Sequence, residues 1–409
     1  MRRTLIIIAI VVVVAGIGAA VYFFFFAGSA GVAVAPAGST GLPSAGNSAT
    51  GTSGGSLAAG TVPNSPTKVT ARLVKIDAGP VVLGEAAVDV NVLLDGALAT
   101  TTRAGSSTPD VSVEYIERQS GNIFSYLVNA GTLTRTSNKT LPGIQNAAWL
   151  PDGSNVFVQY LSGTDSSTIN TYSLPANGQG GFFLPQNLSE ISVGTNSILT
   201  LASGVNGSLG MVERPDGSKS VQAFSTPLSM VRAGFAGKDY LVYTKPSATL
   251  DGYAYLVDPS GNFSRIAGPL PGLVALASPL GTWVLVSWSE SGVMSMELVN
   301  TKTRAVTALP VATIADKCIW SADESAIYCG IPIDPSANYA YPDDWYQGAV
   351  SFNDNIWKID VAGRLAELEL DFSSATDVEL DAEALTIDPE SKTLVFVNKN
   401  DGSLWSYQL

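Results

Sequence analysis

The residues best suited to binding chemistry are gathered in one aromatic and acidic segment, residues 330–353. Six of its side chains combine flat contact area with carboxylates: Tyr339, Tyr341, Asp343, Asp344, Trp345 and Tyr346. Aromatic residues in a Pro-containing loop supply contact area at a small entropic cost. One interpretation is a recognition loop for a protein, a peptide or a glycan. The other is a loop folded across the mouth of a central channel, with its rings packed on neighbouring strands.

Catalytic chemistry is limited because the 409 residues include no histidine. Ser-His-Asp and Cys-His nucleophilic sites and histidine-based zinc sites are therefore excluded. The sequence has no P-loop, dinucleotide-binding glycine motif or EF-hand loop either, so we predict no cofactor and no metal site. Two facing carboxylates would be enough for a glycan hydrolase or lyase. This alternative predicts a pair of acids across the channel mouth that includes Asp343 or Asp344.

A second group of acids alternates in large part with apolar residues between positions 367 and 383. Its members are Glu367, Glu369, Asp371, Asp377, Glu379, Asp381 and Glu383. Hard cations take several oxygen ligands, but calcium loops space their acids more closely and include a glycine. The pattern favours the solvated face of a strand over a cation site.

The two cysteines, Cys318 and Cys329, flank a predicted turn at residues 321–325. If Trp320 faces Ile327 across this hairpin, the cysteines face each other, because both pairs are symmetric about the turn. Opposed cysteines in a non-hydrogen-bonded pair are close enough to be bridged, and an oxidising compartment favours the bond. We expect a structural disulfide; two buried thiols are the alternative, and a redox role is the least favoured.

Strand patterns that position these residues recur along the chain. Gaps of 43, 43, 42, 43, 43 and 67 residues separate seven alternating strand cores, centred at Val113, Val156, Leu199, Leu241, Val284, Ile327 and Leu394. A period of about 40–45 residues with short strands is typical of a β-propeller with four-stranded blades. The last gap places an insertion of about 24 residues, which is the aromatic segment, between the second and third strands of the sixth blade.

The seventh blade needs a strand from elsewhere, because the sequence stops at Leu409 directly after a third-strand pattern. Residues 69–76 alternate correctly and are predicted to supply it, which would remove two exposed sheet edges. The first strand of the first blade is expected within 85–94, followed by a loop at 97–110. The predicted fold is an all-β seven-bladed propeller over residues 68–409, closed by an N-terminal strand.

Repeated motifs in the chain resemble those of TolB-like and WD40-like propellers. Trp320-Ser-Ala-Asp-Glu and Trp149-Leu-Pro-Asp-Gly are similar to the W-S-P-D-G repeat, and Asn355-Ile-Trp-Lys-Ile-Asp360 is similar to D-I-Y-x-x-D. The Gly-His and Trp-Asp dipeptides of strict WD40 repeats are missing. The resemblance covers about residues 70–409 and extends to uncharacterised bacterial membrane-anchored propeller proteins. It implies the fold and no particular activity, since propellers host many functions.

An uninterrupted apolar run, residues 5–27, follows Arg2 and Arg3. As a helix it would be long enough to cross a bilayer; a cleaved signal peptide, with a shorter apolar core, is the alternative. The arginines place the N-terminus in the cytoplasm. We therefore predict a single transmembrane anchor at 1–27, an uncharged flexible Gly/Ser/Ala/Pro linker at 28–67, and an extracytoplasmic propeller in the cell membrane.

The net charge of −13 argues against nucleic acid as a partner, because a phosphate backbone would be repelled. The predicted function is a membrane-anchored extracytoplasmic module that binds or scaffolds a protein or a cell-envelope polymer. One alternative is a carboxylate-dependent hydrolase or lyase acting on envelope glycans. Another is a subunit of a secretion or pilus-like assembly.

Overall fold

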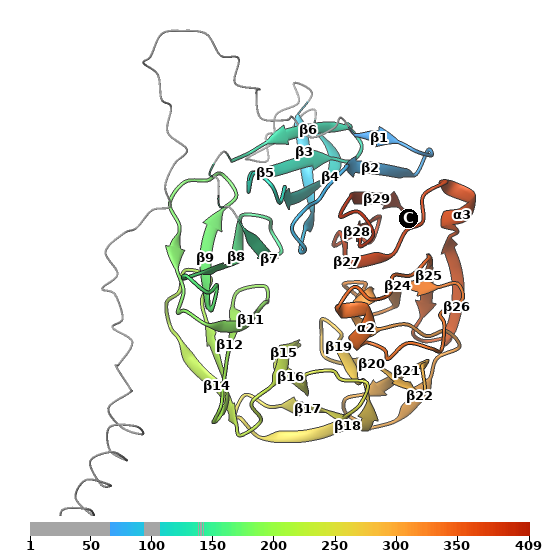
Figure 1. The fold of residues 1–409 in the computed structure, drawn as a ribbon. Helices are drawn as coiled ribbons and strands as arrows, with labels where there is room; N and C mark the ends of the chain where they lie inside the picture. The colour runs from blue at the N-terminus through green and yellow to red at the C-terminus, as the bar shows by residue number, and fades with distance from the viewer. Residues whose placement is uncertain (1–65, 94–106, 138, 140, 142) are drawn as a thin grey trace, which may run out of the picture. The chain divides into compact units, whose positions relative to one another are not determined.

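A computed structural model describes residues 66–93, 107–137, 139, 141 and 143–409 of the chain. In these ranges the strands form seven antiparallel sheets arranged as blades around a central axis (Figure 1). The predicted all-β seven-bladed propeller is therefore confirmed. The predicted anchor at 1–27 and nearly all of the predicted linker lie outside the described residues. Within the described ranges, no helix is long and apolar enough to cross a membrane.

Six blades each contain four strands in chain order, from the innermost to the outermost. Blade 1 contains β3 (Ala86–Leu93), β4 (Ser107–Ile116), β5 (Ile123–Leu127) and β6 (Thr132–Arg135). Blade 2 contains β7 (Ile144–Trp149), β8 (Asn155–Ser162), β9 (Thr168–Pro175) and β10 (Phe182–Phe183). Blade 3 contains β11 (Leu188–Val193), β12 (Ile198–Gly204), β13 (Gly207–Glu213) and β14 (Val221–Thr226).

The next three blades repeat this order. Blade 4 contains β15 (Val231–Ala236), β16 (Asp239–Thr244), β17 (Asp251–Val257) and β18 (Phe263–Pro271). Blade 5 contains β19 (Val274–Ala277), β20 (Trp283–Glu290), β21 (Val293–Asn300) and β22 (Val306–Ala308). Blade 6 contains β23 (Cys318–Trp320), β24 (Ala326–Pro332), β25 (Asp354–Asp360) and β26 (Leu365–Leu370). The described residues also form three short helices: η1 (Ala315–Lys317), α2 (Asp343–Tyr346) and α3 (Phe372–Ala375).

Blade 7 takes strands from two distant parts of the chain. Its three C-terminal strands are β27 (Ala382–Ile387), β28 (Thr393–Asn398) and β29 (Leu404–Gln408), and β29 pairs with β2 (Leu73–Asp77). The predicted closure by an N-terminal strand is confirmed (Figure 1). A fifth strand, β1 (Thr67–Lys68), pairs with the outer side of β2.

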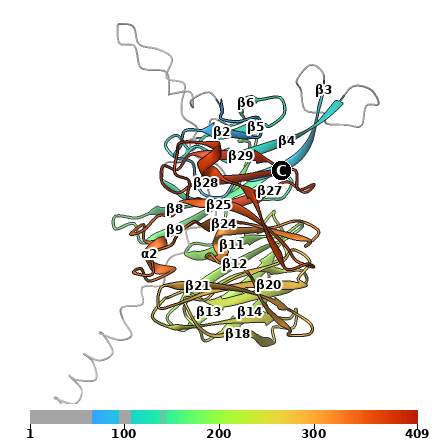
Figure 2. The same cartoon turned by 90° about the vertical axis from the view of Figure 1, so that its right-hand side faces the viewer.

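The closing strand starts later than the predicted range 69–76. The Thr70 hydroxyl oxygen accepts hydrogen bonds from the backbone N–H groups of Arg72 and Leu73, at 3.2 and 2.9 Å. This turn reverses the chain between β1 and β2 and ends the alternation that the sequence pattern suggested. The predicted loop 97–110 is also wrong at its end, because β4 begins at Ser107 and pairs with β3 as far as Leu93. The two strands extend beyond the rest of blade 1 (Figure 2).

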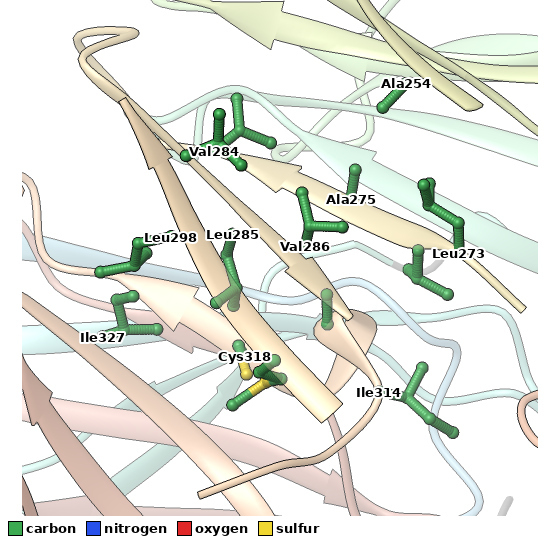
Figure 3. Close-up of a cluster of buried hydrophobic side chains, with 14 of the residues drawn as sticks. Ala254, Leu273, Ala275, Val284, Leu285, Val286, Leu298, Ile314, Cys318 and Ile327 are labelled. Carbon is green, nitrogen blue, oxygen red and sulfur yellow. The ribbon is translucent and has the colours of Figure 1, made fainter. Parts of the chain in front are cut away.

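Blade faces pack on each other, so the middle strands are apolar on both sides. Val284, Leu285 and Val286 in β20 are all completely buried. Figure 3 shows Leu285 pointing toward Cys318 and Ile327 of blade 6. Because successive side chains of a strand point to opposite faces, its two neighbours pack in the other direction. The apolar core is thus a series of layers between blades, which fixes the loops at both ends of the ring.

Turns between the first and second strands of a blade use short polar residues. In blade 2, Asp152 accepts hydrogen bonds from the N–H and hydroxyl groups of Ser154, at 3.0 and 2.7 Å. The intervening Gly153 has φ +68°, a conformation that glycine adopts without strain. In blade 6 the corresponding position is Glu324, with φ 61°. Its carboxylate accepts a 2.6 Å hydrogen bond from the N–H of Leu280, which joins blade 6 to blade 5.

Candidate functional site

Two adjoining cavities open on the face where the innermost strands begin and where the second strand of each blade turns into the third. We call this the mouth face. The larger cavity, about 870 Å³, is lined by Met230, Arg232, Thr244, Lys245, Pro246, Ser247, Leu250, Asp251, Asp316, Asp343, Tyr346 and Gln347. The smaller, about 720 Å³, is lined by Asn146, Ser189, Glu190, Ser203, Gly204, Val205, Ser229, Met230, Val231, Arg232 and Lys245. Because three residues line both cavities, we treat the two cavities as one groove and call it the mouth groove.

Arg232 in β15 forms the polar centre of the mouth groove. Its Nε donates to Glu190 at 3.4 Å, and its Nη1 donates to Asp316 at 2.5 Å. The same Asp316 oxygen accepts a hydrogen bond from the Tyr346 hydroxyl at 2.6 Å. Blades 3, 4 and 6 and the inserted segment therefore meet at one guanidinium group.

The acids around Arg232 are already engaged by the protein. Besides the guanidinium, Glu190 accepts a 2.8 Å hydrogen bond from the backbone N–H of Ala233. Burial raises the pKa of Glu190, and the positive charge of Arg232 acts in the opposite direction. In contrast, the Nη2 group of Arg232 and the Nζ of Lys245 have no hydrogen-bond or ion-pair partner among the described residues. The unused polar capacity at the groove centre is therefore cationic.

Exposed apolar side chains border the same groove. Val205, at the turn between β12 and β13, is 96% exposed, and Leu250, just before β17, is 68% exposed. Met230, which lines both cavities, is 59% exposed. Apolar side chains scattered singly over a surface are ordinary, but several around one hollow mark an interaction site.

The six residues of the aromatic segment predicted to bind a ligand divide into two groups. Tyr341 and Trp345 are buried, with rings 5.4 and 6.3 Å from the ring of Phe352. Tyr339 and Tyr346 are partly exposed, and only Tyr346 lines the mouth groove. The segment therefore packs some of its rings on the blades and presents others to solvent.

The two acids of the segment hold loops in place. Asp343 lines the groove and accepts hydrogen bonds from Ser247 Oγ and Ala248 N, at 3.3 and 2.9 Å. Asp344 accepts one from the backbone N–H of Ala340 at 2.7 Å. Asp343 thereby fastens the segment to the loop between β16 and β17, and Asp344 holds a turn within the segment. Neither acid faces a second carboxylate in these contacts.

A buried charge cluster that the sequence did not predict lies beneath the inserted segment. Lys317 is completely buried and its ammonium donates to Asp354 at 2.8 Å, to Asp381, and to the carbonyl of Ala382 at 2.9 Å. Asp381 also accepts a hydrogen bond from Trp345 Nε1 at 3.0 Å. Asp381, which the alternation placed on a solvated face, is therefore inside the protein. Among the described residues, no group of three or more His, Cys, Asp or Glu is arranged to hold a metal ion.

Cys318 and Cys329 form a disulfide with a Cα–Cα distance of 4.1 Å. They are directly opposite each other in the β23–β24 pair, and Trp320 is opposite Ile327. The bridge joins the first two strands of the blade that carries the inserted segment.

The residues at the centre of the groove were not predicted from the sequence. In the sequence, nothing distinguishes Glu190 and Arg232 from other polar residues of strands. They are, however, 42 residues apart, the spacing of the strand cores in blades 3 and 4. Aligning the repeats would have placed both at the start of an innermost strand, where side chains face the channel mouth.

Comparison with known proteins establishes the fold. No protein-family model and no curated protein matches the sequence. Among solved structures, an oligogalacturonate lyase in complex with manganese is similar, with a TM-score of 0.52 and 11% identity over 79% of this chain and 90% of that one. An oligogalacturonate lyase from Vibrio parahaemolyticus has a TM-score of 0.53 and 8% identity over 82% and 93%.

TolB from Acinetobacter baumannii is also among the similar structures, with a TM-score of 0.42 and 11% identity over 74% of this chain and 77% of that one. The expected TolB-like propeller is confirmed at the level of the fold, which the seven blades define. Likeness at such identities says nothing about activity, because a fold does not determine a function.

Proposed function

We propose that this protein is a membrane-anchored extracytoplasmic module that binds a partner protein in the mouth groove. The observation that carries the proposal is the combination of unused cationic donors, Arg232 Nη2 and Lys245 Nζ, with the exposed apolar residues around them. Protein interfaces are typically built in this way, from apolar contacts with a few placed polar groups. The apolar run at 5–27 and the uncharged segment after it support anchoring outside the cytoplasm.

Binding is better supported than glycan cleavage. Two of the similar structures are oligogalacturonate lyases, and cleavage by carboxylates would need two acids free to act on a bound glycan. In the groove, Glu190, Asp316 and Asp343 each accept hydrogen bonds from the protein. The two carboxylates that pair with Lys317 in the charge cluster, Asp354 and Asp381, are completely buried.

Affinity capture with the full chain in detergent tests the binding function. Solubilised envelope extract is passed over the wild type, over Met230→Glu in the groove, and over Leu280→Glu as the control. Leu280 is 68% exposed in the turn between β19 and β20, at the opposite end of the ring from the groove. We expect one or more proteins to be retained by the wild type and the control and lost with Met230→Glu. Equal retention by all three would place the binding surface elsewhere.

The proposed topology has its own test. Alkaline phosphatase, which is active only outside the cytoplasm, is fused after Leu409. We expect an active fusion, and a fusion to a chain without residues 1–27 should be inactive. Activity that does not depend on residues 1–27 would contradict the proposed topology, in which these residues direct the propeller out of the cytoplasm.

A further inference from the structure

We propose that the mouth groove binds an extended segment of the partner protein in which one acidic residue is flanked on both sides by apolar residues. This inference rests on the binding function proposed above and adds the chemistry of the partner to it. Three features of the groove support it: the cations, the apolar border and their order along the groove.

The cations of the groove are the groups with hydrogen bonds left to give. Two of the three guanidinium nitrogens of Arg232 donate to Glu190 and Asp316. Its Nη2 and the Lys245 ammonium have no hydrogen-bond or ion-pair partner among the described residues. The acids nearby already accept hydrogen bonds, and Asp251 is the groove acid without a partner among the described residues. An incoming carboxylate would therefore gain charge-assisted hydrogen bonds without displacing an internal one.

The apolar border lies on both sides of these cations. Val205 lines only the smaller cavity, Leu250 lines only the larger one, and Met230 lines both. All three are more than half exposed. A ligand with an apolar residue before and after its carboxylate would cover them and remove apolar surface from water.

The position of the cations along the groove indicates that the ligand's carboxylate belongs to a side chain and not to a chain terminus. Arg232 and Lys245 line both cavities, so they lie where the cavities meet. A C-terminal carboxylate held there would leave one cavity empty. A segment that passes through the groove fills both cavities of about 870 and 720 Å³ and brings the side chain of Asp or Glu to the centre.

Selection from a displayed peptide library tests the inference. Random nonapeptides, joined to the display protein at both ends so that none has a free terminus, are selected on the full chain in detergent. We expect the wild type to enrich sequences with a central Asp or Glu and apolar residues on both sides. Lys245→Glu should instead enrich Lys or Arg at the centre, because a carboxylate at position 245 repels acidic side chains and attracts basic ones. Lys238→Glu is the control, because Lys238 is exposed and lies just before the opposite end of β16. It should select the same sequences as the wild type.

The binding of one synthetic peptide with the enriched sequence gives the quantitative result. We expect Lys245→Glu to weaken its binding at least about tenfold and Lys238→Glu to leave it unchanged. Enriched sequences without an acid, or equal binding by all three proteins, would overturn the inference and leave the binding function standing. Absence of any enrichment would also overturn it, and the affinity capture would then decide the binding function separately.

Discussion

At the scale of single residues, the least expected feature is Lys317, a completely buried lysine. Burial lowers the pKa of an ammonium group, but here Asp354 and Asp381 more than compensate, so the pKa of Lys317 is raised. Its carboxylate partners are Asp354, the first residue of β25, and Asp381, the residue before β27, and these strands belong to different blades. One Asp354 oxygen has no hydrogen-bond partner. The cluster thus joins blades 6 and 7 and is sensitive to the loss of any member.

Replacing Lys317 with Met tests the cluster. The change leaves two buried carboxylates without their cation, and breaking a buried ion pair in this way costs about 3–5 kcal/mol. We expect a loss of that size in the free energy of unfolding, measured by urea denaturation at pH 7. Lys392→Met, which breaks an exposed pair with Glu390, is the control and should change little. Similar effects of the two substitutions would contradict the account.

The pH dependence of stability gives a second test at this scale. Burial raises the pKa of Asp354 from 3.8 to about 6. Between these values the folded protein keeps a proton that the unfolded chain releases, so this group's contribution to stability falls as pH rises from about 4 to 6. We expect Asp354→Asn to remove this slope. Parallel stability profiles of the variant and the wild type from pH 4 to 7 would show that Asp354 does not titrate in that range.

At the scale of elements, blade 6 combines the disulfide, the charge cluster and the inserted segment. Its strand pairing places Cys318 opposite Cys329, and β24 is buried along its whole length. The inserted segment that follows β24 packs on the charge cluster through Trp345, whose indole nitrogen donates to Asp381 at the edge of blade 7. We infer that the rigidity of this blade positions Tyr346 and Asp343 in the mouth groove.

Removing the disulfide should lower the stability of the propeller. The loop between Cys318 and Cys329 spans 11 residues, for which cross-linking stabilises by about 3 kcal/mol at most. We expect the double variant Cys318→Ser/Cys329→Ser to lose up to this amount in denaturant unfolding. Wild type treated with reductant should lose as much. A wild type that reductant does not change would mean that the bridge is absent or has no effect on stability.

The strands were predictable where alternation and turn residues agree, and the exceptions have local causes. The third strand of blade 3, β13, escaped prediction because it contains Gly207 and Gly210. At Gly210 a Cβ atom would lie 2.4 Å from the ring of Phe224, so the site has no room for an apolar side chain. Which residues of the aromatic segment are buried could not be predicted from the sequence either. Trp345 donates a hydrogen bond to Asp381, which lies 36 residues further along the chain.

At the scale of the whole molecule, the period of the strand cores predicted the number of blades, and the missing outer strand predicted ring closure. Leu73 and Ile76 of the closing strand are completely buried. The groove was harder to predict, because it is a product of the ring. Glu190, Arg232 and Asp316 come from three blades and meet only when the innermost strands surround one axis. A repeat pattern defines the blades, but side chains from different blades make the site.

The central claim is that the mouth groove is the surface that contacts the partner. The measurement that tests it most directly is site-specific photo-crosslinking in intact cells that produce the full chain. A photoreactive amino acid replaces Leu250 in the groove or Leu280 at the other end of the ring, which are equally exposed at 68%. We predict a discrete crosslinked species, containing a second protein, from position 250 and not from position 280. Crosslinking from position 280 alone, or from neither position, would contradict the claim.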